Sequence, residues 1–136
     1  MARTETFFDT NVLLYLLSGD VSKADRAEKL LAAGGVISVQ VLNEFASVAS
    51  RKLGMSWMEI REVLETVQAV CRVEPISLEM HDRGIALSER YGFAVYDSMI
   101  LASALLAGCN LLFTGDLQDG QSIDGSLTVR NPFTVK

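Results

Sequence analysis

The sequence predicts an α/β protein in which a parallel sheet is covered by helices on both faces. Short apolar segments rich in strand-forming residues alternate with longer segments whose apolar residues recur at helical spacing. Continuous apolar runs are typical of parallel strands, because helices bury both faces of such a sheet. The length of 136 residues suits one compact domain, and we expect residues 1–136 to form it.

The predicted elements follow one another with short connections. We expect strands at residues 5–8, 36–39 and 111–113, another near Val73, and a last short strand at 127–129. We expect helices that begin after Asp9 and at Ser56, and further helices at 22–33, 38–53, 77–91 and 96–107. Glycines at positions 34, 54, 92 and 108 are placed to end four of them.

Asp9 lies where the first predicted strand meets the first predicted helix. Phe7 and Phe8 give the strand its apolar character, and Thr10 or Asn11 is the expected N-cap of the helix. Ligands and catalytic groups collect at the carboxyl ends of strands in open α/β sheets. We therefore expect the functional site to be built around Asp9.

The composition predicts a soluble, cytoplasmic protein. Hydrophobic residues make up 49% of the chain, but no apolar run reaches the length of a membrane span. The N-terminus lacks the pattern of a secretory signal peptide. Cys71 and Cys109 both have apolar neighbours, so we expect reduced core residues rather than a disulfide or a metal site.

The net charge of −5 argues at first against a nucleic-acid partner, since phosphate contacts need Lys and Arg. That argument weakens if several acids gather at one metal site. Two bound divalent cations would bring the formal charge close to neutral. An RNA or DNA substrate therefore stays compatible with the sequence.

Four acids are candidates for such a site: Asp9, Glu44, Asp97 and Asp116. Each also has an ordinary structural interpretation: Asp9 could cap a helix, and Glu44 could be an exposed helix residue. Asp97 could cap a helix or complement its dipole, and Asp116 could be a turn residue. The context favours a site. Asp97 opens a helix that is almost wholly apolar, and Glu44 lies among apolar residues, where a carboxylate needs a partner.

Converging carboxylates repel one another unless a cation balances them. Mg²⁺ or Mn²⁺ prefers oxygen ligands and suits such a cluster. The sequence offers few other groups that could bind phosphate or act as a base. There is no glycine-rich phosphate loop, and we expect the single histidine, His81, to lie on a helix surface. The pattern therefore predicts metal-assisted phosphodiester chemistry.

The sequence resembles the PIN-domain nucleases, and among them the VapC toxins of toxin–antitoxin pairs. Four segments carry the resemblance, in the family's order and over nearly the whole chain: residues 8–13, 38–45, 96–104 and 114–118. Each segment contains one of the four acids. The tail at 129–133 is also similar to the end of these proteins.

The resemblance implies a three-layer α/β/α fold with a central parallel sheet of about four to five strands. It implies a Mg²⁺-dependent endoribonuclease. Asp9 and Asp97 would be direct ligands of the metal, and Glu44 and Asp116 would bind the metal directly, through water or at a second site. Residues that would orient these carboxylates are Thr10, Asn11 and Thr114. Many relatives carry a further acid followed by Phe; here Asp119 precedes Gly120, and its role stays open.

The resemblance also implies an RNA substrate and a cognate antitoxin. A homodimer would suit a small domain that needs a longer RNA-binding surface. The helices around residues 20–70 offer apolar surface for the antitoxin and for a second copy, although the same residues also fit an ordinary core. Candidate phosphate contacts are Arg51, Lys52 and Arg61, although each also fits a solvated helix face. Two alternatives stay open: a catalytically silent PIN-like binding or regulatory subunit, and a receiver-type phosphoacceptor module, which would need a lysine that residues 111–116 lack.

Overall fold

The computed structural model describes residues 5–133, and within them it has six strands, six α-helices and a 3-10 turn. The strands are β1 (Thr6–Phe8), β2 (Gly35–Ser38), β3 (Cys71–Glu74), β4 (Leu111–Phe113), β5 (Ser122–Ile123) and β6 (Leu127–Arg130). The helices are α1 (Thr10–Leu14), α2 (Val21–Ala32), α3 (Val39–Arg51), α4 (Trp57–Val70), α5 (Leu78–Tyr91) and α6 (Val95–Leu106), and the 3-10 turn η1 (Tyr15–Leu17) follows α1.

The strands form one sheet in the order β3-β2-β1-β4-β6-β5. The first five of these are parallel, which confirms the predicted number of parallel strands, and β5 runs antiparallel at the edge. From β1 the chain proceeds outward to β2 and β3, and then returns to β4 on the other side of β1. The carboxyl ends of β1 and β4 therefore form a topological switch point, where open α/β sheets bind ligands.

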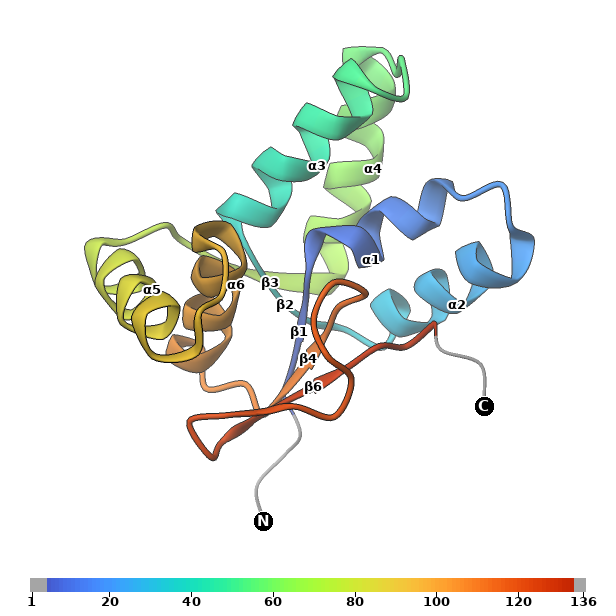
Figure 1. Ribbon diagram of the computed structural model, residues 1–136. Coiled ribbons are helices and arrows are strands. Elements are labelled where there is room, and N and C mark those ends of the chain that lie inside the picture. The colour runs from blue at the N-terminus through green and yellow to red at the C-terminus, as the bar shows by residue number, and fades with distance from the viewer. Residues whose placement is uncertain (1–4, 134–136) are drawn as a thin grey trace.

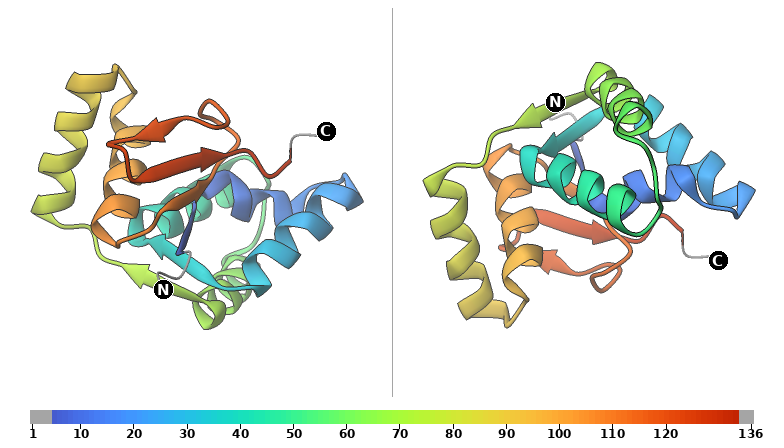
Figure 2. Two further views of the ribbon diagram at one scale, coloured as in Figure 1. Left: turned by 90° about the horizontal axis from the view of Figure 1, so that it is seen from below. Right: turned by 90° about the horizontal axis from the view of Figure 1, so that it is seen from above.

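Helices cover both faces of the sheet, which confirms the α/β/α layers. Figure 1 shows α5 and α6 on the left of the sheet and α1 and α2 on its right. The two views of Figure 2 agree with this arrangement. Helix α3 rises from the carboxyl end of β2, and α4 returns beside it to β3 (Figure 1). The switch point thus lies at the base of the space between α1, α3 and α6.

The core confirms the predictions made for the apolar helix and the cysteines. Every residue of α6 from 98 to 104 is buried, so this helix is central to the fold. Cys71 and Cys109 are both buried and unbridged. Burial raises the pKa of the Cys71 thiol to about 11 and that of Cys109 to about 12, so both are inert at neutral pH. No helix within residues 5–133 is long and apolar enough to cross a membrane.

The structure corrects two details at the amino ends of helices. The cap of α1 is Asp9 itself, whose carboxylate accepts from the Thr10 backbone N–H; Thr10 and Asn11 lie inside the helix. Helix α2 begins at Val21 because Asp20 caps it. In both places a carboxylate supplies the acceptor that exposed N–H groups need. The predicted Ser56 cap is confirmed and forms a capping box with Glu59.

Candidate active site

Asp9 is the buried centre of the switch point. Its side chain follows β1 directly and is 5% exposed. Oδ1 accepts a 2.6 Å hydrogen bond from the Thr10 N–H, and Oδ2 accepts a 2.7 Å bond from the Thr114 hydroxyl. The two donors come from the strand ends on either side of the switch point, so they fix the carboxylate between β1 and β4.

Glu44 faces Asp9 from helix α3. One carboxylate oxygen accepts from the Thr10 hydroxyl at 3.2 Å, and the other accepts from Gln40 Nε2 at 3.1 Å. Gln40 lies one helical turn before Glu44, on the same face of α3. Its Nε2 also donates to the Tyr96 carbonyl of α6 at 3.3 Å. Glu44 is therefore held by neighbours from two elements.

Asp97 and Asp116 complete the set of predicted acids. Asp97 lies in the first turn of α6 and is half-buried. Asp116 lies in the exposed loop after β4, where its backbone N–H donates to the Thr114 hydroxyl at 3.1 Å. Thr114 thus anchors both the buried carboxylate of Asp9 and the backbone of Asp116.

One cavity of about 280 Å³ is lined by all four acids. They come from the ends of β1 and β4, from α3 and from the start of α6, as the sequence predicted. Arg51, from the last turn of α3, also lines the cavity, and its Nε donates to the Ser47 hydroxyl at 3.1 Å. The two other candidate phosphate contacts, Lys52 and Arg61, are not among the lining residues.

The electrostatics of the cavity favour a cation. The pKa of Asp9 is raised from 3.8 to about 6: burial is the largest cause, the charges of Asp116 and Glu44 add to it, and the hydrogen bonds from Thr114 and Thr10 act in the opposite direction. The pKa of Asp97 is raised as well, first by burial and then by the charge of Asp116. Carboxylates that oppose one another's ionisation are arranged for a positive ligand.

The oxygen donors of the cavity fit a hard divalent cation. Within residues 5–133, no three His, Cys, Asp or Glu side chains lie close enough together to enclose a metal ion by themselves. Mg²⁺ does not require such a cage, since it usually takes one or two carboxylates and keeps several waters. Asp9 and Asp97 are the pair with raised pKa values, and both face the cavity.

The residues predicted to orient the carboxylates lie where they can do so. Thr10 donates to Glu44, and Thr114 donates to Asp9. Asn11 connects α1 to the loop after β4: its Oδ1 accepts from the Gly115 N–H at 3.2 Å, and its Nδ2 donates to the Thr114 hydroxyl at 3.5 Å. These contacts hold the strand ends together across the switch point.

Sequence reasoning missed Gln40 and left Asp119 open. The signal for Gln40 was its position four residues before Glu44, which places an amide beside that carboxylate on a helix. Asp119 does not line the cavity; its Oδ1 accepts from the Asn131 N–H at 2.9 Å. Asp119 therefore fastens the C-terminal tail.

The family model for the PIN domain matches residues 6–118. A chain of a toxin–antitoxin complex from Klebsiella pneumoniae is 24% identical, with a TM-score of 0.71 over 96% of this chain and 100% of that one. VapC20 of Mycobacterium tuberculosis, described as a sarcin-ricin loop cleaving toxin, is 19% identical, with a TM-score of 0.63 over 82% of this chain and 92% of its own.

A chain of VapBC2 from Rickettsia felis, solved with a DNA fragment from their promoter, is 19% identical, with a TM-score of 0.67 over 94% of this chain and 98% of that one. None of the curated proteins matches the chain. The solved structures show a shared fold, and the family model covers most of the sequence. The protein therefore belongs to the PIN domain family, which confirms the resemblance carried by the four acid-containing segments.

Proposed function

We propose that the protein is a Mg²⁺-dependent endoribonuclease and the toxin of a type II toxin–antitoxin pair. One observation carries this proposal: four carboxylates from separate segments line one cavity at the switch point of a PIN fold. PIN nucleases generally use a divalent metal, and the acidic donors here suit Mg²⁺ or Mn²⁺. The toxin assignment is supported by the similar solved structures, whose descriptions name toxins and toxin–antitoxin complexes.

Asp9 and Asp97 would hold the cation directly, and Glu44 and Asp116 would hold it directly, through water or at a second position. When bound, the cation supplies a water-derived nucleophile and neutralises charge that develops on the phosphodiester. Thr114 and the Thr10 N–H keep the Asp9 carboxylate in one orientation. Gln40 does the same for Glu44.

The reaction is a hydrolysis. An oxygen of water forms a bond to phosphorus, the phosphorus–oxygen bond to one ribose breaks, and the departing ribose oxygen takes up a proton. Among the described residues that line the cavity there is neither Lys nor His, so the carboxylates are the groups that can accept the proton of water. Arg51 is the lining cation that can contact a flanking phosphate.

The protein partner would be a cognate antitoxin, and we also infer a homodimer. Between residues 20 and 70, several large apolar side chains are exposed, among them Val21, Leu53, Trp57 and Met58. An amphipathic helix of a partner can cover such a surface. Light scattering of the purified chain, alone and with the antitoxin, would measure both associations.

The proposal is tested by incubating RNA with the purified chain in Mg²⁺, in Mn²⁺ and in EDTA. We expect discrete fragments with either metal and none in EDTA. Asp97→Asn should abolish cleavage and keep the fold, whereas Asp82→Asn, an exposed acid of α5 outside the cavity, should cleave like the parent.

Equal cleavage by the parent and by both Asp9→Asn and Asp97→Asn would show that the site is assigned wrongly. Absence of both cleavage and metal binding would favour the silent-subunit alternative. The receiver-type alternative predicts an aspartyl-phosphate after treatment with a small phosphodonor, and membership of the PIN family argues against it.

A further inference from the structure

A second cavity adjoins the acidic one, and we propose that it binds an unstacked nucleobase next to the scissile phosphate. This proposal rests on the proposed ribonuclease function. The second cavity has a volume of about 570 Å³ and lies between α3 and the α5–α6 pair. Glu44 and Ser47 line both cavities, so a chain that occupies the acidic site can extend directly into its neighbour.

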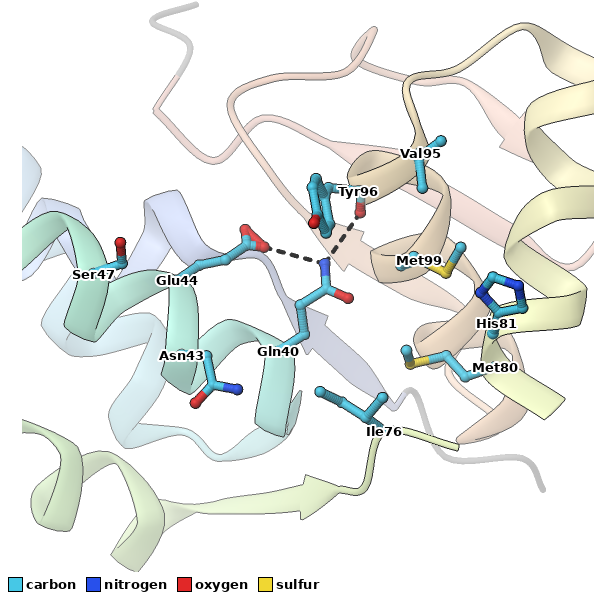
Figure 3. A pocket seen from close by; sticks show the side chains of 10 residues that line it. All are labelled: Gln40, Asn43, Glu44, Ser47, Ile76, Met80, His81, Val95, Tyr96 and Met99. Atoms are coloured by element: carbon cyan, nitrogen blue, oxygen red, sulfur yellow. Dashed lines mark hydrogen bonds between the residues drawn. The ribbon is translucent and has the colours of Figure 1, made fainter. Parts of the chain in front are cut away.

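Gln40 provides a hydrogen-bond acceptor that opens into this second cavity. Its side chain is 8% exposed, and its Nε2 donates to a carboxylate oxygen of Glu44 and to the carbonyl of Tyr96. Both partners are acceptors, so the amide has only one possible orientation. Oε1 therefore points away from them and into the cavity, toward His81 and Met99 (Figure 3).

No described residue donates a hydrogen bond to this Oε1. This oxygen is open to the cavity, since no described side chain has a buried polar atom without a partner, and a ligand N–H can replace the water that would otherwise bond to it. Every nucleobase carries an amino or imino N–H on its Watson–Crick edge, and these edges are free in single-stranded RNA. An acceptor that faces the cavity thus fits a base, whereas a phosphate group, which brings acceptors only, does not fit.

The rest of the lining suits a flat, polarisable ring. Met80 and Met99 are almost fully buried, and both line the cavity (Figure 3). Sulfur makes favourable contacts with aromatic rings. Tyr96, which also lines the cavity, is 72% exposed as a residue, so its ring is available for stacking. Its neighbour in sequence, Asp97, lines the acidic cavity.

His81 and Asn43 add polar groups at the edge of the same cavity. Both are exposed, which confirms the expectation that His81 lies on a helix surface. Neither makes a side-chain hydrogen bond to another described residue, so both remain able to contact the edge of a base. These two side chains would determine which base is preferred, while Gln40 requires only that an N–H be present.

The test observes the two methionines directly. The chain has five methionines, and labelling their methyl groups with ¹³C gives one NMR signal for each. Each of the four ribonucleoside 5′-monophosphates is added in EDTA, so that binding is measured without metal or cleavage. We expect the Met80 and Met99 signals to shift with at least one nucleotide, while those of Met55 and Met58, outside the cavity, stay in place.

Variants of the exposed Tyr96 ring separate stacking from loss of structure. Tyr96→Ala should weaken nucleotide binding at least fivefold, and Tyr96→Phe should retain it because the ring remains. Ile85→Ala, which removes an exposed apolar side chain of α5 outside the cavity, should leave binding unchanged. In a cleavage assay, Tyr96→Ala should change the preferred nucleotide at one position beside the cut.

Three results would overturn the proposal. One is the absence of a Met80 or Met99 shift with all four nucleotides. Another is an equal shift with ribose 5-phosphate, since this would show that sugar or phosphate is bound instead of a base. The third is movement of the same signals when the protein alone is diluted, which would show that a second copy fills the cavity. RNA cleavage without these shifts would leave the nuclease proposal standing and remove this one.

Discussion

The Thr114 hydroxyl donates a 2.7 Å hydrogen bond to the Asp9 carboxylate and so joins the carboxyl ends of the paired strands β1 and β4 at the switch point. Thr114 is fully buried, and the same hydroxyl accepts from the backbone N–H of Asp116. One small side chain therefore positions a buried acid and the loop that carries an exposed one. This contact makes the candidate site dependent on the pairing of β1 with β4.

Replacing Thr114 with Val should weaken both stability and metal binding. Valine has a similar shape but leaves the buried oxygen of Asp9 without a donor, which costs about 1–3 kcal/mol. We also expect the pKa of Asp9 to rise, because the lost hydrogen bond lowers it in the parent. Thr114→Ser keeps the hydroxyl and serves as the control. Urea unfolding and Mg²⁺ calorimetry would measure both effects, and equal behaviour of the two variants would refute the role given to the hydroxyl.

Asp9→Asn should stabilise the metal-free fold at pH 7 and abolish cleavage. The pKa of Asp9 rises from 3.8 to about 6 in the folded chain, so its ionisation opposes folding by up to about 3 kcal/mol. The asparagine side chain has one oxygen and cannot accept both hydrogen bonds that the carboxylate accepts. This loss reduces the stabilisation by about 1 kcal/mol. A net rise in the free energy of unfolding is expected.

The pH dependence of the free energy of unfolding, measured in EDTA, tests whether ionisation of Asp9 destabilises the fold. For an acid whose folded pKa is raised, stability is highest below the unfolded value and falls as pH rises from about 4 to about 6. The parent should show this fall more strongly than Asp9→Asn. Parallel stability curves for the two proteins between these pH values would contradict the burial of an ionisable group at position 9.

Gly35→Ala should destabilise the sheet beneath the site. A Cβ at this position would lie 2.5 Å from the Phe8 ring and 2.7 Å from the Thr6 carbonyl, so β1 and β2 would have to separate. Overpacking of this kind costs about 1–3 kcal/mol. Gly19→Ala, which places a Cβ in open space, is the matched control and should leave the thermal midpoint within about 2 °C.

Tyr91→Phe should loosen the hairpin of β5 and β6. The Tyr91 hydroxyl donates to Asp124 Oδ1 at 3.0 Å and accepts from the Asp124 N–H at 2.9 Å. Asp124 has a φ of 49°, so these bonds hold a turn that few residues adopt easily. We expect a loss of about 1–2 kcal/mol and faster amide exchange at residues 122–129. The Tyr15 hydroxyl bonds to no described residue, so Tyr15→Phe should change neither the free energy of unfolding nor the rate of amide exchange.

Most of the fold was predictable because its elements carry strong local signals. The helix predicted at 96–107 lies within one residue of α6 at both ends. The strand predicted at 111–113 has the same bounds as β4. The strand β5 was missed, since two residues flanked by polar loops show no periodicity. The predicted cap of α1, Thr10 or Asn11, lies one or two residues after the observed cap, Asp9, because Asp, Thr and Asn all favour that role and only tertiary packing selects among them.

Asp9 and Asp116 could be placed at one edge from sequence, because the carboxyl ends of parallel strands share that edge. Glu44 and Asp97 lie on helices, and the resemblance to the PIN-domain nucleases assigned them to the same cluster. Their supporting contacts could not be predicted in the same way. The bond from Gln40 to the Tyr96 carbonyl joins two helices that are distant in sequence, and the second cavity exists only where those helices meet. His81 illustrates the limit: its exposure was predicted, but its place in a cavity was not.

The origin of the oxygen on the new phosphate end tests the central claim most directly. RNA is cleaved by the parent chain in H₂¹⁸O with Mg²⁺, and the fragment ends are analysed by mass spectrometry. Hydrolysis by water predicts one ¹⁸O atom in each new terminal phosphate and no cleavage in EDTA. Fragments that end in 2′,3′-cyclic phosphate, formed equally well in EDTA and by Asp97→Asn, would show that the ribose hydroxyl attacks and that the acidic cavity is not the catalytic site.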